Sequence, residues 1–390
     1  MWYLLTPPIG AILVYYLMKP PLKIYYIDNI KVLLTILVVL HHCCVAYGAP
    51  GGWYYKESTT SHWALAPITI FVCLNQSFFM GFFFFLSSFF AGSSYDRKGF
   101  SKFVGDRLWR LGIPLLFYSF IFSPFLSYLV NYFAKGNHIS YGNYLRGFDG
   151  WIDFGVLWFV AALLLFTLVY ALWRVLSKRD VPEGLPLPGR STILWFAAGT
   201  GLVSFVVRIF FPVGWVLKPL GFQPGHFTQY IVLFCLGLVA AKNNWLPQIP
   251  DNAARRFGRN VPRSLLIFVL FFILNITLHT PQEWYSGGFH WQSLLYALWE
   301  QLVGFSIIVA LLSLGKRKWN VRTPLLGRLS RSAFAVYIFH PVVIISLSLA
   351  VRGWNVDPAV KLLVVAPLAV LGSFLLGALV TEIPGVKKVI

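Results

Sequence analysis

The fold is decided by the stretch from residue 29 to residue 48, which reads NIKVLLTILVVLHHCCVAYG. A helix needs roughly 20 predominantly apolar residues to cross the hydrocarbon core of a bilayer, and this stretch carries no charged side chain after Lys31. Inside a bilayer such a segment must be helical, because only a helix satisfies all of its own backbone polar groups. The stretch therefore predicts a transmembrane helix that carries titratable side chains.

Similar apolar runs recur along the whole chain. Of its 390 residues 58% are hydrophobic and only 12% are charged, with a mean hydropathy of +0.70, whereas soluble domains are about one quarter charged. We predict an all-α polytopic membrane protein, a bundle of about ten transmembrane helices. The expected spans are residues 29–48, 67–91, 111–133, 155–175, 192–211, 227–242, 262–279, 294–314, 333–350 and 360–381.

The domain organisation follows from these runs. Residues 1–26 form an N-terminal apolar segment without a basic start or a small-residue cleavage site, so they are not typical of a signal peptide. We expect this segment to be an interfacial helix or an additional span. Residues 27–385 form the transmembrane domain, and no separate soluble domain is expected. The four cysteines lie inside apolar runs, where a thiol usually packs as a small hydrophobic group.

The basic residues indicate the orientation of the bundle. The formal net charge is +19, and 25 of the 32 Lys and Arg lie at the chain ends or in the even-numbered connections between spans. Under the positive-inside rule these segments are cytoplasmic, as are both the N- and the C-terminus. Because membrane topology explains the positive charge, no nucleic-acid partner is expected. We expect the chain to lie in the lipid bilayer of the cell (plasma or inner) membrane.

The first span contains titratable side chains that are candidates for a functional site. Lys31 lies at its predicted cytoplasmic start, and His42 lies about 16 Å further along at 1.5 Å per residue. Eleven residues are close to three turns, so Lys31 and His42 project from nearly one face, while His41 points about 100° away. Ionisable groups at membrane depth are costly, which makes His42 a functional candidate.

Further polar residues fall inside later spans. His340 lies about 13 Å beyond Arg331 on span nine and should reach a depth similar to that of His42. Other buried polar candidates are Glu300, Gln301, Asn275, Asn75 and Gln76. Each of them could instead make ordinary hydrogen bonds between helices.

The chemistry that these residue types allow is narrow. A neutral histidine can take a proton from a hydroxyl, which suits a general base. No metal site is expected, because the consecutive residues His41, His42, Cys43 and Cys44 splay around one helix. Phosphate-loop, dinucleotide-binding and serine-nucleophile motifs are not found in the sequence.

Five strings, taken in order, resemble the acyltransferase 3 family of multi-pass membrane O-acyltransferases. The first is YIDNIK at 26–31, followed by ten residues and His42, although the family usually has Arg where this chain has Lys31. The others are FMGFFFFLSSFF at 79–90, RLWRLGIP at 107–114, LWFV at 157–160 and YIFHP at 337–341. The opening motif and the paired histidines are most similar to the glucan biosynthesis branch of the family.

The resemblance implies transfer of an acyl group, acetyl or succinyl, from acyl-coenzyme A to a hydroxyl of a carbohydrate such as a cell-envelope glycan. The catalytic residues would be His42, Lys31 and Asp28, with His42 acting as general base or acyl carrier. The substrate-binding residues would be Arg107, Arg110, Trp158, His340 and Glu300, with the two arginines receiving the coenzyme A phosphates. Acyl-coenzyme A would be a donor substrate, with no bound cofactor.

Two other classes of function fit the residues alone. A transporter or flippase for a lipid-linked glycan or small solute would also contain about ten spans with buried His and Glu. A non-catalytic membrane scaffold would need neither transfer nor flux. An enzyme would transfer acyl groups in detergent without any gradient. A transporter would show gradient-dependent solute flux, and a scaffold would show neither.

Overall fold

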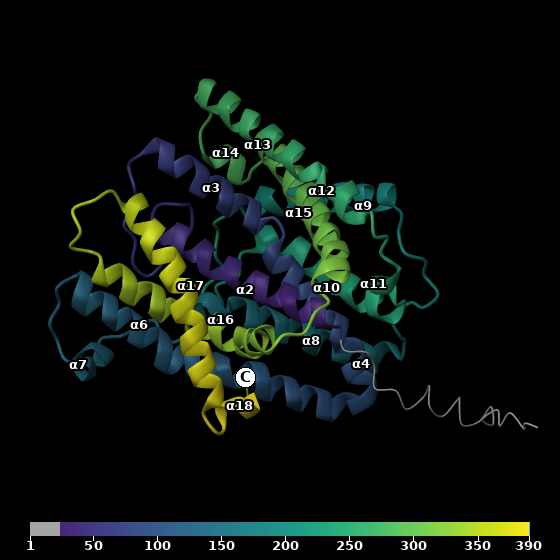
Figure 1. The fold of residues 1–390 in the computed structure, drawn as a ribbon, viewed down its shortest axis with the longest axis horizontal. Coiled ribbons are helices and arrows are strands. Elements are labelled where there is room, and N and C mark those ends of the chain that lie inside the picture. Colours follow the sequence, from purple (N-terminus) through teal and green to yellow (C-terminus); the bar gives the residue numbers. More distant parts are fainter. Residues whose placement is uncertain (1–23, 390) are drawn as a thin grey trace, which may run out of the picture.

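The structure, a computed structural model, describes residues 24–389 and forms one bundle of helices (Figure 1). The described residues contain no β-strand, which confirms the all-α prediction. The helices in chain order are α2 (Tyr25–Ala46), α3 (His62–Gln76), α4 (Phe79–Arg107), η1 (Leu108–Gly112), α5 (Ile113–Phe117), η2 (Tyr118–Phe122), α6 (Ser123–Leu129), η3 (Val130–Ala134), α7 (Tyr141–Arg146), η4 (Gly155–Leu157), α8 (Trp158–Ser177), α9 (Arg190–Phe210), α10 (Pro224–Lys242), α11 (Trp245–Gln248), α12 (Ala253–Gly258), α13 (Asn260–Thr277), α14 (Glu283–Ser286), α15 (Trp291–Lys318), α16 (Pro324–Ala350), α17 (Pro358–Glu382) and α18 (Val386–Val389).

The described residues contain nine helical stretches that are long and apolar enough to cross a membrane. One of them, His62–Ala134, is 73 residues long, about 110 Å at the rise of a helix and far more than a bilayer of about 30 Å needs. It holds two of the expected spans, 67–91 and 111–133. The chain turns between them at Gly99, whose φ of 69° is in the left-handed region that glycine adopts without strain.

Nearly all of the N-terminal segment 1–26 lies outside the described residues. The prediction that it is an interfacial helix or an additional span therefore stays a prediction.

The expected span 67–91 is interrupted at Ser77, where α3 ends before α4 begins. Gly304 of α15 packs against this break so closely that a Cβ atom there would lie 2.0 Å from the Ser77 carbonyl oxygen. The same carbonyl accepts a hydrogen bond of 2.7 Å from Gln229 of α10. The break thus joins α3, α10 and α15, and its freed carbonyl has a partner, as an apolar environment requires.

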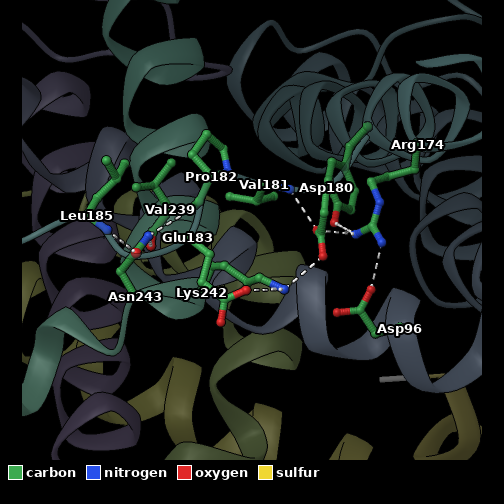
Figure 2. Close-up of polar contacts among 11 residues, drawn as sticks. Asp96, Arg174, Asp180, Val181, Pro182, Glu183, Leu185, Val239, Lys242 and Asn243 are labelled. Atoms are coloured by element: carbon green, nitrogen blue, oxygen red, sulfur yellow. Dashed lines mark hydrogen bonds and ion pairs between the residues drawn. The ribbon is translucent and has the colours of Figure 1, made fainter. Parts of the chain in front are cut away.

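The predicted cytoplasmic connections meet on one face of the bundle. Arg174 of α8 contacts Asp96 of α4 at 2.9 Å and Asp180 at 3.1 Å, and Lys242 at the end of α10 contacts Asp180 at 2.7 Å (Figure 2). The hydrogen bond from Lys242 lowers the pKa of the Asp180 carboxyl. This network ties the connection after α8 to the ends of α4 and α10.

The remaining basic segments lie on the same face. Lys316 at the end of α15 contacts Asp251 at 3.1 Å, and the backbone N–H of Tyr26 donates to Asn320 at 3.3 Å. The C-terminal helix α18 packs against η1. The segments that the charge count assigned to one side therefore do share one face, and the assignment of that face to the cytoplasm stays a prediction. We call it the basic face.

Helix α2 lies in the middle of the bundle. It packs against α3, α4, α15, α16 and α17, and Figure 1 shows α16 and α17 beside it. Its start lies at the basic face, where Asn29 donates to the Trp319 carbonyl at 2.6 Å. Its end therefore carries His41 and His42 towards the opposite face, one turn before the helix ends at Ala46.

Candidate active site

A cavity of about 820 Å³ lies at the end of α2. Its walls include His42 of α2, Trp158 of α8 and His226 of α10. Four connections also line it, with contributions from residues within 50–54, 153–156, 213–223 and 282–286. These are odd-numbered connections between the expected spans and are not among those that form the basic face, so the cavity lies towards the opposite side of the bundle.

The structure brings His340 of α16 against His42, although 298 residues separate them. His340 Nε2 lies 2.9 Å from His42 Nδ1. The two rings are stacked with their centroids 4.9 Å apart, and the Trp53 ring stacks against both, with its centroid 4.5 Å from that of His42 and 6.1 Å from that of His340. The prediction that His42 and His340 reach similar depths is therefore confirmed, and the two histidines form one hydrogen-bonded unit.

The partners of His340 define which nitrogen of His42 carries hydrogen. His340 Nδ1 lies 2.9 Å from the Tyr337 carbonyl and 3.3 Å from the Val336 carbonyl. A carbonyl only accepts, so Nδ1 of His340 carries a hydrogen, and in the neutral ring Nε2 must accept. His42 Nδ1 is then the donor to His340, and His42 Nε2 is left with an unprotonated lone pair. This pattern holds one imidazole in the tautomer that a general base requires.

His41 faces a different environment, as its position on the helix predicts. Its Nδ1 lies 3.3 Å from the Asn75 amide nitrogen, and its ring stacks on Phe79 at 5.1 Å. The side chain lies against the break between α3 and α4. His41 also borders the cavity, but it lacks the hydrogen-bonded partner histidine that His42 has.

Lys31 and Asp28 lie at the far end of α2 from the cavity. They form an ion pair of 3.7 Å, and the Lys31 ammonium lies 5.0 Å from the centre of the Phe90 ring. Neither residue lines the cavity that contains His42. The structure therefore separates the three predicted catalytic residues along the length of one helix.

Arg107 and Arg110 lie where α4 passes into the π-helical turn η1, at the basic face. Arg107 packs over the Phe103 ring at 4.9 Å, and its Nε is buried without a hydrogen-bond partner. Arg110 is largely exposed and lies 3.7 Å from Asp106. Neither arginine reaches the cavity, so any contact with substrate would be at the opposite end of the bundle from His42.

Trp158 begins α8 and lines the cavity. Its ring stacks on Tyr230 at 5.5 Å. Of the five predicted substrate-binding residues, Trp158 is therefore the one that lines the cavity. His340 does not line it and instead makes a hydrogen bond with His42.

Glu300 occupies a buried cluster that sequence reasoning found only in part. Its carboxylate pairs with Arg208 of α9, and its Oε1 lies 3.2 Å from Nδ1 of His226. Arg208 is fully buried and Glu300 is 1% exposed. Glu300 itself does not line the cavity, whereas His226 does. Arg208 and His226 were missed, although an arginine inside an apolar run was a signal that could have identified the first.

Two contacts fix the loop that carries Trp53 over His42. Glu57 in this loop forms an ion pair of 2.5 Å with Lys361 of α17, which is 4% exposed. Tyr55 donates a hydrogen bond of 2.7 Å to Glu57. Burial, followed by this hydrogen bond, raises the pKa of Tyr55, so its hydroxyl stays protonated and can donate.

Comparison with known proteins places the chain in a family. Residues 24–378 match the family model described as an acyltransferase domain. The chain is similar to the Glucans biosynthesis proteins C of Salmonella paratyphi A, Salmonella agona (strain SL483) and Salmonella enteritidis PT4. Each is 22% identical over 344 residues, which cover 82% of this chain and 82% of the relative. No solved structure matches it. With its bundle of membrane-spanning helices, the chain belongs to the acyltransferase 3 family and is a multi-pass membrane acyltransferase.

Proposed function

We propose that this enzyme moves an acyl group, acetyl or succinyl, from acyl-coenzyme A to a hydroxyl of a carbohydrate acceptor, with His42 as general base. The observation that carries the proposal is the hydrogen bond between His340 and His42, the latter of which lines the cavity. The pair leaves the lone pair of His42 Nε2 available to a hydroxyl, which is what general base catalysis needs.

The reaction balances with His42 as the only proton carrier. Nε2 takes the proton of the acceptor hydroxyl while the oxygen attacks the thioester carbonyl and forms the new C–O bond. The C–S bond of the tetrahedral intermediate then breaks, and the coenzyme A thiolate receives the proton from His42. His340 accepts a hydrogen bond from His42 Nδ1 throughout and so stabilises the imidazolium that forms transiently.

The donor would approach from the basic face. Arg107 and Arg110 offer guanidinium groups to the phosphates of coenzyme A. The acyl arm would then follow α2 past Asp28 and Lys31 to His42, about 16 Å along the helix. With the basic face in the cytoplasm of a plasma or inner membrane, the donor would come from the cytoplasmic pool.

A carbohydrate acceptor would enter the cavity from the opposite face. The name of the similar Salmonella proteins refers to glucan biosynthesis, and the cavity combines aromatic faces with polar side chains, including Trp53, Trp158, Gln223 and Gln282. A few polar groups among aromatic walls are typical of a small-molecule site. Such walls suit a sugar, which presents hydroxyls at its rim and C–H groups on its faces.

The test is transfer of label by the purified protein. Radiolabelled acetyl- or succinyl-coenzyme A is incubated with a membrane glycan extract in detergent without any ion gradient, alongside His42→Ala. We expect label to move to glycan with the wild type and to fall by about 10²- to 10⁴-fold with the variant. Undiminished transfer by a folded His42→Ala protein would remove His42 from the mechanism, and gradient-dependent flux without a covalent product would favour the transporter.

A further inference from the structure

We propose that His226 is a binding residue for the carbohydrate acceptor, donating a hydrogen bond from Nε2 to an acceptor oxygen, and that Arg208 and Glu300 are positioning residues that hold its ring. This inference rests on the proposed function and assigns a role to a further histidine in the wall of the same cavity. His42 and His226 both line that cavity, but the two imidazoles have opposite hydrogen-bonding characters.

The cluster around His226 is assembled from three helices. Arg208 of α9 pairs with Glu300 of α15 and donates through Nε to the Gly225 carbonyl at 3.0 Å. Its guanidinium also lies 5.5 Å from the centre of the Tyr296 ring. A buried ion pair is costly to form, and within a membrane bundle such groups usually mark a functional site.

The cluster places a hydrogen on the nitrogen of His226 that it does not contact. Nη2 of Arg208 lies 3.3 Å from Nδ1 of His226, and a guanidinium can only donate. Nδ1 of the neutral ring therefore accepts, and Nε2 carries the hydrogen. The contact of Nδ1 with Glu300 Oε1 at 3.2 Å is not a hydrogen bond, because this carboxylate oxygen is buried without a hydrogen-bond partner, so the neutral ring does not donate to it from Nδ1. A protonated ring would also carry hydrogen on Nε2. In both states Nε2 is a donor.

This donor has no partner within the described part of the chain, where the polar contacts of His226 are made by Nδ1 and by its backbone. Because His226 lines the cavity while its Nδ1 is engaged with Arg208 and Glu300, Nε2 is available to a bound molecule. His42 presents a lone pair to the same space. A sugar can satisfy both groups, since each of its hydroxyls both donates and accepts.

The position of the cluster fixes the backbone of this wall as well as the ring. The Gly225 carbonyl that Arg208 contacts immediately precedes His226 in the first turn of α10. The Arg208 carbonyl accepts from the Gly288 N–H at 3.2 Å, and the Ser286 carbonyl accepts from the Val213 N–H at 2.7 Å. The two connections that border this side of the cavity are therefore held against Arg208 and against each other.

The decisive variants are His226→Phe and His226→Gln. Phe keeps a ring of similar shape and removes the donor, whereas the Gln amide can place an N–H near the position of Nε2. We expect His226→Phe to raise the acceptor KM about tenfold, which corresponds to one lost hydrogen bond, and to leave the donor KM and kcat unchanged. His226→Gln should restore most of the acceptor affinity.

Glu300→Gln tests the positioning role. It should raise the acceptor KM in the same direction while the donor KM stays at its wild-type value, whereas general loosening of the bundle would change both. A fall in kcat with an unchanged acceptor KM in His226→Phe would overturn the proposal and would instead indicate stabilisation of the transition state.

Direct binding separates this proposal from the proposed function. Binding of a tritium-labelled glucan oligosaccharide to the full-length protein is measured in detergent without acyl donor, and the folding of each variant is checked by its Tm. Weaker binding by His226→Phe and recovery by His226→Gln support the acceptor site even if coenzyme A proves to be the wrong donor. Equal binding by wild type and a folded His226→Phe, or no saturable binding by the wild type, overturns it.

Discussion

Replacing His340 by Leu should slow acyl transfer without removing the base itself. His340 is fully buried, and its Nε2 accepts the hydrogen of His42 Nδ1 over 2.9 Å. Leucine fills a similar volume but cannot accept a hydrogen bond. The His42 ring would lose the contact that fixes its tautomer and orientation, so the lone pair of Nε2 would face the cavity in only part of the population.

The size of the effect follows from the lost contact. A hydrogen bond contributes about 0.5–1.5 kcal/mol net, and a buried donor left without a partner costs about 1–3 kcal/mol. Because the His42 imidazolium forms during the reaction, this loss falls on the transition state, and each 1.4 kcal/mol is about a tenfold change in rate. We expect kcat to fall by about 10- to 100-fold, less than for His42→Ala.

The assay is kcat at saturating donor and acceptor, with Tm as the control for folding. His340→Gln is the matched variant, because its amide oxygen can accept the hydrogen of His42 Nδ1, and it should keep most of the activity. The reasoning is refuted if His340→Leu has the wild-type kcat, or if the Leu and Gln variants lose activity equally while both remain folded.

Two further predictions concern the basic face. Arg107→Gln or Arg110→Gln should each raise the apparent donor KM about tenfold, because a hydrogen bond to a charged group contributes about 1.5–3 kcal/mol; an unchanged donor KM in titrations with acyl-coenzyme A would rule out the phosphate role. Asp180→Asn should lower the Tm at neutral pH. The hydrogen bond from Lys242 depresses the pKa of Asp180, so its stabilisation is present above the unfolded pKa of about 3.9 and is lost as the pH falls through the lower folded value. The difference in Tm between wild type and Asp180→Asn should therefore shrink at acidic pH and at high salt, and a difference that grows on acidification would contradict the ion-pair argument.

Much of the candidate site could be predicted from local sequence. The spacing of Lys31, His41 and His42 on one helix fixed their relative directions, since a helix has a known rise and rotation per residue. Trp158 and His340 lie in short motifs, and the structure places one in the cavity wall and the other against His42. The depth of His42 depends on where α2 ends among its neighbours, which local sequence does not specify.

The buried cluster around His226 could not have been predicted from the sequence. Arg208, His226 and Glu300 come from α9, α10 and α15 and meet only when those helices pack. Each residue alone is compatible with an ordinary hydrogen bond between helices. No sequence spacing connects them, since the contact depends on the rotation of each helix about its own axis.

The sequence by itself determined that the chain is a helical membrane bundle with its basic connections on one face. A long apolar segment in lipid must satisfy its own backbone hydrogen bonds, so it is helical. The positive-inside rule depends only on which connections carry Lys and Arg, and these can be counted in the sequence. The tertiary structure alone decided that His340 orients His42, that Gly304 packs into the break at Ser77, and that Glu300 supports a residue of the cavity rather than lining it. These pairings depend on the shapes of side chains at helix interfaces, which apolar length and charge do not specify.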